Sequence, residues 1–357
     1  MPSRANLDHV NPARAASVNL ALLRKHIPGY KATTAVGMSN LLAWMLTGQG
    51  FSTSKFLDQH PFFFDNAATC ISHFEEAQES NAAIKTQYLL SHPKTSAPAL
   101  KQLTEYMVLD DPNVWGQASN ELSLTPTIRN SGGKTRSLPQ KFNPCFSQKI
   151  VQEPWKKWLG PLFGKNPAEY LGPRHSWLEG VDLIQSFGIN GVKGNGLTTL
   201  QLANNLVFLG ICVEPTAAEM GAWIADNTTL GAFKGLVLLG FNITASDPVG
   251  TRVAFQVFYD HCDRFLSNED KQFLGFGPIF VEHLLCKVQR WQERYAVGAS
   301  PTDTLEAFAH AQLSSLPWVS GANVDDPRCF PFPLGIETQR LGQVIKDIMV
   351  RILKARF

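Results

Sequence analysis

The sequence predicts an all-α protein: a large multi-helix globular body with a basic N-terminal arm, a long basic loop and a C-terminal amphipathic helix. Over most of the 357-residue chain, apolar residues recur at intervals of three and four. This is the period of a helix that buries one face. Strand-like alternation is scarce, and several of the helical segments begin with residues that cap helices.

In the first part of the chain, Pro and Gly delimit the helical segments. The first segment stops before Pro28 and the second before Gly48, because neither residue type favours continuation of a helix. Asp65 can cap the third helix, and Pro98 suits the first turn of the fourth. We therefore expect helices over residues 17–27, 38–46, 65–88 and 98–109.

A break follows over residues 123–144. This segment holds three prolines and two adjacent glycines and has no sustained apolar period. A segment of this length without periodicity is usually a functional or disordered loop. We predict a basic flexible loop here.

The helical period resumes after the loop. Ser267 and Asp303 each precede an acidic residue by three positions, a pattern that caps helix starts. A second irregular segment, residues 314–335, contains four prolines and leads into the last helix. The predicted helices are 146–159 (kinked near Pro154), 167–186, 197–212, 217–226, 230–239, 249–266, 269–273, 278–295, 303–313 and 337–356.

These signals divide the chain into segments by character. Residues 1–57 form the basic arm and first helices, and 58–122 form a helical acidic segment. The basic loop covers 123–144, the main helical core 145–313, and the Pro-rich connection with the C-terminal helix 314–357.

The net charge is only +2, but the charges are segregated along the chain. Acidic residues are absent from 9–57 and from 122–152, whereas residues 58–121 hold nine acids against three lysines. Cations in acid-free arms and loops suit neutralisation of a phosphate backbone, although they could also simply solvate the surface. The candidate nucleic-acid contacts are Arg14, Arg24, Lys25, Arg129, Lys134, Arg136, Lys141 and Lys149.

The composition favours contact between copies of the chain. Only 17% of residues are charged, and the chain holds 23 Phe and 8 Trp. Depletion of charge with enrichment of aromatic residues is typical of interface cores. We expect a homo-oligomer, while a single well-packed globule would also fit these numbers.

The C-terminal segment 337–356 predicts an amphipathic helix with a basic polar side. Its apolar positions recur at spacings of three and four. Packing into the core of its own or a neighbouring subunit fits better than binding to an anionic membrane. The apolar positions are Leu341, Val344, Ile345, Ile348, Ile352 and Leu353.

No motif in the chain predicts a cofactor, a metal or catalysis. Ser131–Thr135 resembles the tail of a phosphate-binding loop, but Ile128 stands where a glycine is required. The six cysteines are scattered without a C-x-x-C pair, and zinc sites usually pair their ligands. If the chain is an enzyme with an unrecognised site, the first suspects are His261, Asp263 and His283.

The leading hypothesis is therefore a non-enzymatic, self-assembling structural protein of the coat or nucleocapsid type that packages nucleic acid, with viral RNA as the expected cargo. The alternative is a helical adaptor or scaffold that binds other proteins. The N-terminus lacks the apolar core of a signal peptide, and no stretch suits a membrane span. We expect an intracellular, cytoplasmic location, and a place in the virion if the chain is a coat protein.

Overall fold

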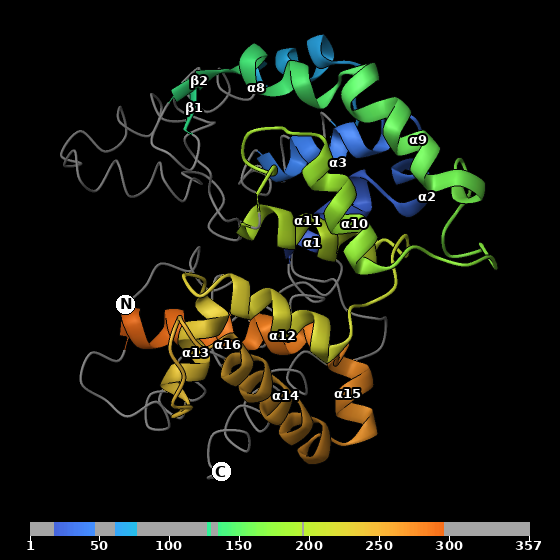
Figure 1. Cartoon of the computed structure of the whole chain (residues 1–357). Coiled ribbons are helices and arrows are strands. Elements are labelled where there is room, and N and C mark those ends of the chain that lie inside the picture. Colours follow the sequence, from blue (N-terminus) through green and yellow to red (C-terminus); the bar gives the residue numbers. More distant parts are fainter. Residues whose placement is uncertain (1–17, 47–60, 77–126, 130–134, 195, 296–357) are drawn as a thin grey trace, which may run out of the picture. The chain divides into compact units, whose positions relative to one another are not determined.

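The computed structural model describes residues 18–46, 61–76, 127–129, 135–194 and 196–295. These residues are mainly helical, as the sequence predicts (Figure 1). They divide into two compact units, one between Ala21 and Val213 and one from Glu214 onward. The predicted basic arm, the helices 98–109, 303–313 and 337–356, and the second half of 65–88 lie outside the described residues.

The first unit is built on helices that meet around aromatic side chains. α1 (Val18–His26) is followed by the short α2 (Gly29–Ala32), by α3 (Gly37–Leu46), whose residues are all buried, and by a helix over residues 67–76. Phe74 of this last helix stacks on Phe142, with ring centroids 4.7 Å apart. Apolar burial is the main stabilising term at such a core.

Asn40 holds an irregular segment against this core. Its Nδ2 donates to the carbonyl oxygen of Phe64 at 2.9 Å, and its Oδ1 accepts from the N–H of Phe64 at 2.8 Å. One buried side chain thus pairs both backbone groups of a residue outside any helix, as buried polar groups require.

The predicted flexible loop is wrong over its second half. Residues 138–145 form α8 (Leu138–Cys145), which buries Leu138, Phe142 and Cys145. Ser137 caps this helix, because its hydroxyl accepts from the N–H of Gln140 at 3.4 Å while the Gln140 side chain accepts from the N–H of Ser137 at 3.2 Å. The capping box starts the helix; Pro139 lies in its first turn, where proline is tolerated, and only Pro144 lies inside the helix.

A short hairpin precedes α8. The strands β1 (Thr127–Arg129) and β2 (Thr135–Ser137) pair antiparallel, with Ile128 opposite Arg136 and Arg129 opposite Thr135. The sequence reading of the 123–144 segment as a loop missed both strands, because three residues are too few for an alternating pattern to stand out.

The chain then runs through a π-helical turn, η3 (Gln148–Gln152), into α9 (Glu153–Leu159) and a 3-10 turn, η4 (Gly160–Leu162). α10 (Trp177–Ser186) packs against α11 (Leu197–Phe208) (Figure 1). The predicted helix 167–186 is therefore wrong in its first half. Ser176 and Glu179 form a capping box that starts α10 only at Trp177.

The second unit follows the predicted boundaries closely. α12 (Ala217–Asp226) packs on α14 (Pro248–Phe265), and α13 (Gly231–Leu238) packs on α16 (Pro278–Tyr295). The short α15 (Asn268–Leu274) begins at the predicted cap Ser267, whose hydroxyl accepts from the N–H of Asp270 at 3.1 Å. No described helix combines the length and apolar character needed to cross a membrane.

Candidate nucleic-acid interface

The eight residues predicted to contact nucleic acid lie in different parts of the chain. Arg24 and Lys25 close the last turn of α1, and both side chains are exposed. Arg24 donates from Nη2 to the carbonyl oxygen of Phe208 at 3.1 Å, so its guanidinium caps the end of α11. At least one donor of the Arg24 guanidinium is therefore engaged within the protein.

The remaining predicted residues follow the hairpin and the helices after it. Lys141 is half-buried on α8, and Lys149 is exposed on η3. Arg129 and Arg136 belong to the two paired strands. Arg14 and Lys134 lie outside the described residues.

A group of cations lies on α2, η3, α9 and the segment that follows η4, and of these only Lys149 is among the eight predicted contacts. We call this group the basic face, and it consists of Lys31, Lys149, Lys156, Lys157 and Lys165. Lys31 is half-buried and the other four are exposed. Within the described parts of the chain, none of the five pairs with a carboxylate.

Hydrogen bonds between distant segments bring the segments of Lys31, Lys156 and Lys165 together. Trp155 donates from Nε1 to the carbonyl oxygen of Ala32 at 3.1 Å, which fixes α9 on α2. The Thr33 hydroxyl donates to the carbonyl oxygen of Lys165 at 2.6 Å, and the N–H of Gly164 donates to the carbonyl oxygen of Thr33 at 3.0 Å. Figure 1 shows α2 directly beside α9. Lys31, Lys156 and Lys165 are each at most two residues from one of these contacts.

Aromatic rings lie against two of the cations of the basic face. The Nζ of Lys31 lies 4.9 Å from the ring centroid of Phe63, and that of Lys156 lies 5.3 Å from the ring of Phe163. Tyr30, next to Lys31, is 55% exposed. Single-stranded nucleic acids bind surfaces on which cations meet phosphates and rings stack on bases. The basic face carries both kinds of group.

Two tryptophans of α9 take part in a row of stacked rings. The indole of Trp158 stacks on that of Trp155 at 5.3 Å and on the imidazole of His175 at 3.7 Å between centroids. The segment of His175 is fixed in turn by a hydrogen bond from the N–H of Val213 to its carbonyl oxygen at 2.8 Å. The half-buried Trp158 is therefore held in one orientation at the edge of the basic face.

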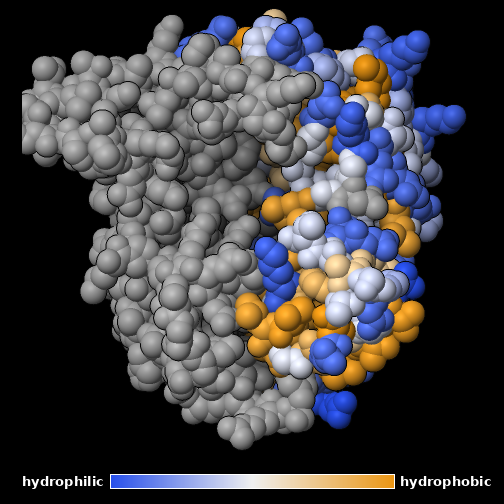
Figure 2. Space-filling model, turned by 60° about the vertical axis from the view of Figure 1, so that its left-hand side comes forward, coloured by the Kyte–Doolittle hydropathy of each residue, from blue (hydrophilic) through white to orange (hydrophobic). Residues whose placement is uncertain are grey.

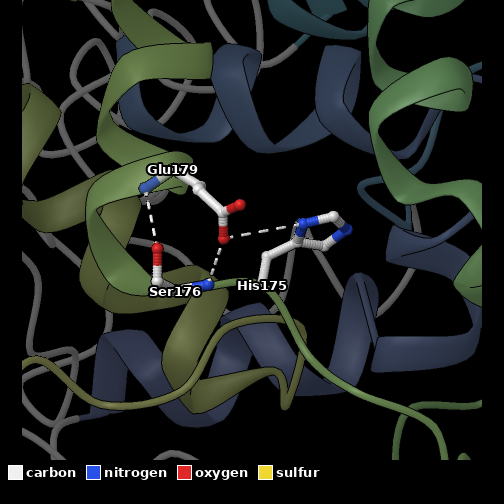
Figure 3. Close-up of polar contacts among 3 residues, drawn as sticks. All are labelled: His175, Ser176 and Glu179. Atoms are coloured by element: carbon white, nitrogen blue, oxygen red, sulfur yellow. Dashed lines mark hydrogen bonds and ion pairs between the residues drawn. The ribbon is translucent and has the colours of Figure 1, made fainter.

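His175 belongs to a polar cluster at the start of α10 (Figure 3). Glu179 accepts the N–H of Ser176 at 2.6 Å, and its carboxylate lies 3.9 Å from Nδ1 of His175. These hydrogen bonds from Ser176, followed by the charge of His175, lower the pKa of Glu179. The Ser176 hydroxyl accepts from the N–H of Glu179 at 3.2 Å. This is the geometry of a helix cap.

The three residues that the sequence offers for an enzyme site are His261, Asp263 and His283, and they lie within the helices of the second unit. Asp263 pairs with Lys271 at 2.8 Å, and the His261 ring lies 4.4 Å from that of Phe265. Burial, with a smaller effect from Arg264, lowers the pKa of His261. His283 is half-buried on α16. In the described ranges, no group of three His, Cys, Asp or Glu side chains could hold a metal ion.

Comparison with known proteins gives no relative: no family, no curated protein and no solved structure matches this chain.

Proposed function

We propose that the chain is a self-assembling structural protein of the coat or nucleocapsid type, and that it packages nucleic acid, with RNA as the cargo. The observation that carries this proposal is the basic face, where five lysines have no carboxylate partner among the described residues and two of them, Lys31 and Lys156, lie against the rings of Phe63 and Phe163. Such a protein would act in the cytoplasm and in the virion.

Electrostatics supports the choice of a phosphate-bearing partner. The described second unit, residues 214–295, holds ten Asp and Glu against seven Lys and Arg, while residues 135–213 hold eight Lys and Arg against four Asp and Glu. A nearly neutral chain therefore has one unit suited to a polyanion and one that would repel it. Binding by the first unit alone would be sequence-independent and sensitive to salt.

The first experiment sizes the purified chain at low and high salt while absorbance is read at 260 and 280 nm. We expect large particles that carry nucleic acid and release it as salt rises, because counterion release drives phosphate binding. A monomer free of nucleic acid at both salt concentrations would overturn the proposal.

The second experiment tests the basic face itself. The variant Lys156→Gln, Lys157→Gln, Lys165→Gln removes three exposed charges. Each lost phosphate contact should reduce the slope of log affinity against log salt by about 0.7 for single-stranded RNA, so we expect a reduction of about 2. The matched control, Lys234→Gln, Arg252→Gln, Arg264→Gln, removes three exposed charges from the second unit and should leave the slope unchanged.

A third variant tests the residues predicted from the sequence. Neutralising Arg129, Lys134, Arg136 and Lys141 together should weaken RNA binding without unfolding the body. Unchanged affinity in this variant and loss in the basic-face variant would assign binding to the basic face alone. Unchanged affinity in both would overturn the proposal.

A further inference from the structure

α14 presents two apolar faces, and only one of them is covered by the described residues. Thr251, Ala254, Phe255, Phe258 and Cys262 are buried, at the spacing of one helix face that packs on α12. On the opposite side lies an exposed row at intervals of four, which we call the valine row: Val249, Val253 and Val257, with exposed fractions of 68%, 57% and 43%.

Valine is an unusual choice for a solvent-exposed helix position. Its branched side chain loses rotamer freedom in a helix, so it favours helices less than Ala, Glu or Lys do. Three valines in succession on one exposed face weaken α14 unless something covers them. Figure 2 shows hydrophobic residues gathered on part of the described surface. An exposed apolar patch on a folded protein marks a binding site.

We infer that the valine row is the docking site of the chain's own C-terminal segment, residues 337–356. This segment has the matching property: the sequence predicts an amphipathic helix whose apolar face includes Val344, Ile345 and Ile348. The segment lies outside the described residues. The inference goes beyond the proposed function, because nothing in it requires nucleic acid.

Charge supports this pairing. Residues 337–356 hold five Lys and Arg against two Asp and Glu, whereas residues 214–295 hold seven Lys and Arg against ten Asp and Glu. A helix with a net charge of +3 would therefore dock on a described unit with a net charge of −3. Opposite potentials of this kind favour association and fix its orientation.

The connection is long enough for docking within one chain. α16 ends at Tyr295, so residues 296–336, 41 in all, join it to the segment. With the predicted helix 303–313 about 16 Å long and the rest as flexible chain, the root-mean-square end-to-end distance of this connection is about 35 Å. α14 itself, with 18 residues, is about 27 Å long. Tethering at this length supplies an effective concentration in the millimolar range, which favours the chain's own segment over that of a second copy.

Hydrogen exchange measured by mass spectrometry on the full chain tests the inference. We expect residues 337–356 to be protected, and the variant Val253→Gln, Val257→Gln to speed their exchange by at least about tenfold. Gln favours helices at least as well as Val, so α14 itself should keep its protection. The matched control, Leu171→Gln, Leu178→Gln, changes two exposed leucines of the first unit and should have no effect on the segment.

A reciprocal variant covers the case in which the α14 substitutions disturb the second unit. Ile345→Gln, Ile348→Gln lies outside that unit's core and should likewise speed exchange of 337–356 by at least about tenfold, with α14 amides still protected. Exchange of 337–356 at the rate of an unstructured peptide in the native chain would overturn the inference. So would protection that neither variant changes, or protection that falls on dilution, which would indicate docking on a second copy.

Discussion

The indole nitrogen of Trp155 lies 3.1 Å from the carbonyl oxygen of Ala32, and this hydrogen bond joins positions 123 residues apart. Both residues are buried. The bond holds α9 on α2 and so determines where Lys156 stands relative to Lys31. The position of the basic face depends on this contact more than on any local feature of α9.

Trp155→Phe should lower the free energy of unfolding by about 1 to 2 kcal/mol. Phe keeps most of the ring packing but leaves the carbonyl oxygen of Ala32 buried without its donor, and the cost of a missing partner is of this size. Urea denaturation followed by circular dichroism measures the change. Trp158→Phe is the control, because Trp158 is half-buried and its contribution is ring stacking, which Phe retains in part. An equal loss in both variants would contradict the role given to the hydrogen bond.

Asn40→Ala should cost more, about 3 kcal/mol. The substitution leaves both the N–H and the carbonyl oxygen of Phe64 without their partner in a buried environment. Each unsatisfied buried group costs about 1 to 3 kcal/mol. Asn66→Ala is the matched control, since Asn66 is exposed and its side chain accepts only from the N–H of Thr69 and contacts the same residue's hydroxyl.

The control should lose about 1 kcal/mol, the usual contribution of a helix cap. Equilibrium unfolding in urea compares the two variants. If Asn40→Ala lowers the free energy of unfolding no more than Asn66→Ala does, the segment of Phe64 does not depend on its two hydrogen bonds with Asn40.

The sequence predicted the helices best where periodicity and breakers agree. α12 and α16 have the predicted bounds, Ala217–Asp226 and Pro278–Tyr295. The errors at α8 and α10 could have been avoided, because Ser137-x-x-Gln140 and Ser176-x-x-Glu179 are capping boxes readable in the sequence. At these two places the proline content and the apolar period favour other boundaries than the capping boxes do.

The basic face could not have been predicted in the same way. Lys31 lies in the acid-free stretch 9–57, Lys156 and Lys157 follow Glu153, the acid that ends the second acid-free stretch, and Lys165 lies beyond it. Their grouping results from tertiary hydrogen bonds of Trp155 and Thr33, which no local pattern encodes. The distribution of charge along the sequence predicted eight contacts, and of these only Lys149 belongs to the basic face.

Gly235→Ala should destabilise the second unit by about 1 to 2 kcal/mol. A Cβ at this position would collide with the backbone carbonyl of Leu285, where α13 and α16 are in close contact. Overpacking against backbone costs about 1 to 3 kcal/mol or more, which outweighs the gain of about 1 kcal/mol in helix propensity. Thermal unfolding measures the loss. Gly194→Ala, where an added Cβ meets nothing within 4 Å, should change stability little, and an equal effect of both would contradict the close contact.

The thiols of Cys145, Cys212 and Cys262 should resist alkylation in the native protein. Burial raises the pKa of each to about 12, against 9.0 for a free thiol. Because the thiolate is the reactive form, its depletion at pH 8 should slow labelling by iodoacetamide at least about 100-fold relative to the urea-unfolded chain. Mass spectrometry of the labelled peptides reports each site separately. Rapid native labelling of any of these three would show that its surroundings open readily.

Glu214→Gln should stabilise the protein increasingly as pH rises. The Glu214 carboxylate accepts the N–H of Ile279 at 3.3 Å, and burial raises its pKa while this hydrogen bond lowers it in part. A carboxyl whose pKa is raised in the folded state stabilises the fold in its protonated form. That contribution is complete below the unfolded pKa, about 4.3, and is lost as pH rises through the folded value. Gln keeps the acceptor oxygen and does not ionise, so its advantage over Glu should grow from pH 4.5 to pH 7.

Glu179→Gln is the control with the opposite sign. The pKa of Glu179 is lowered, chiefly by its hydrogen bonds with Ser176, so its charged form contributes stability above the unfolded pKa and loses it as pH falls through the folded value. The Gln variant should therefore be less stable than the native protein at pH 7, with a deficit that shrinks in acid. Urea midpoints at pH 5.5 and 7 measure the difference for Glu214, and midpoints at pH 3, 3.5 and 4.5 measure the loss for Glu179, which falls below its unfolded pKa. Slopes of the same sign in the two variants would contradict the assignment of burial at Glu214 and of hydrogen bonding at Glu179 as the dominant causes.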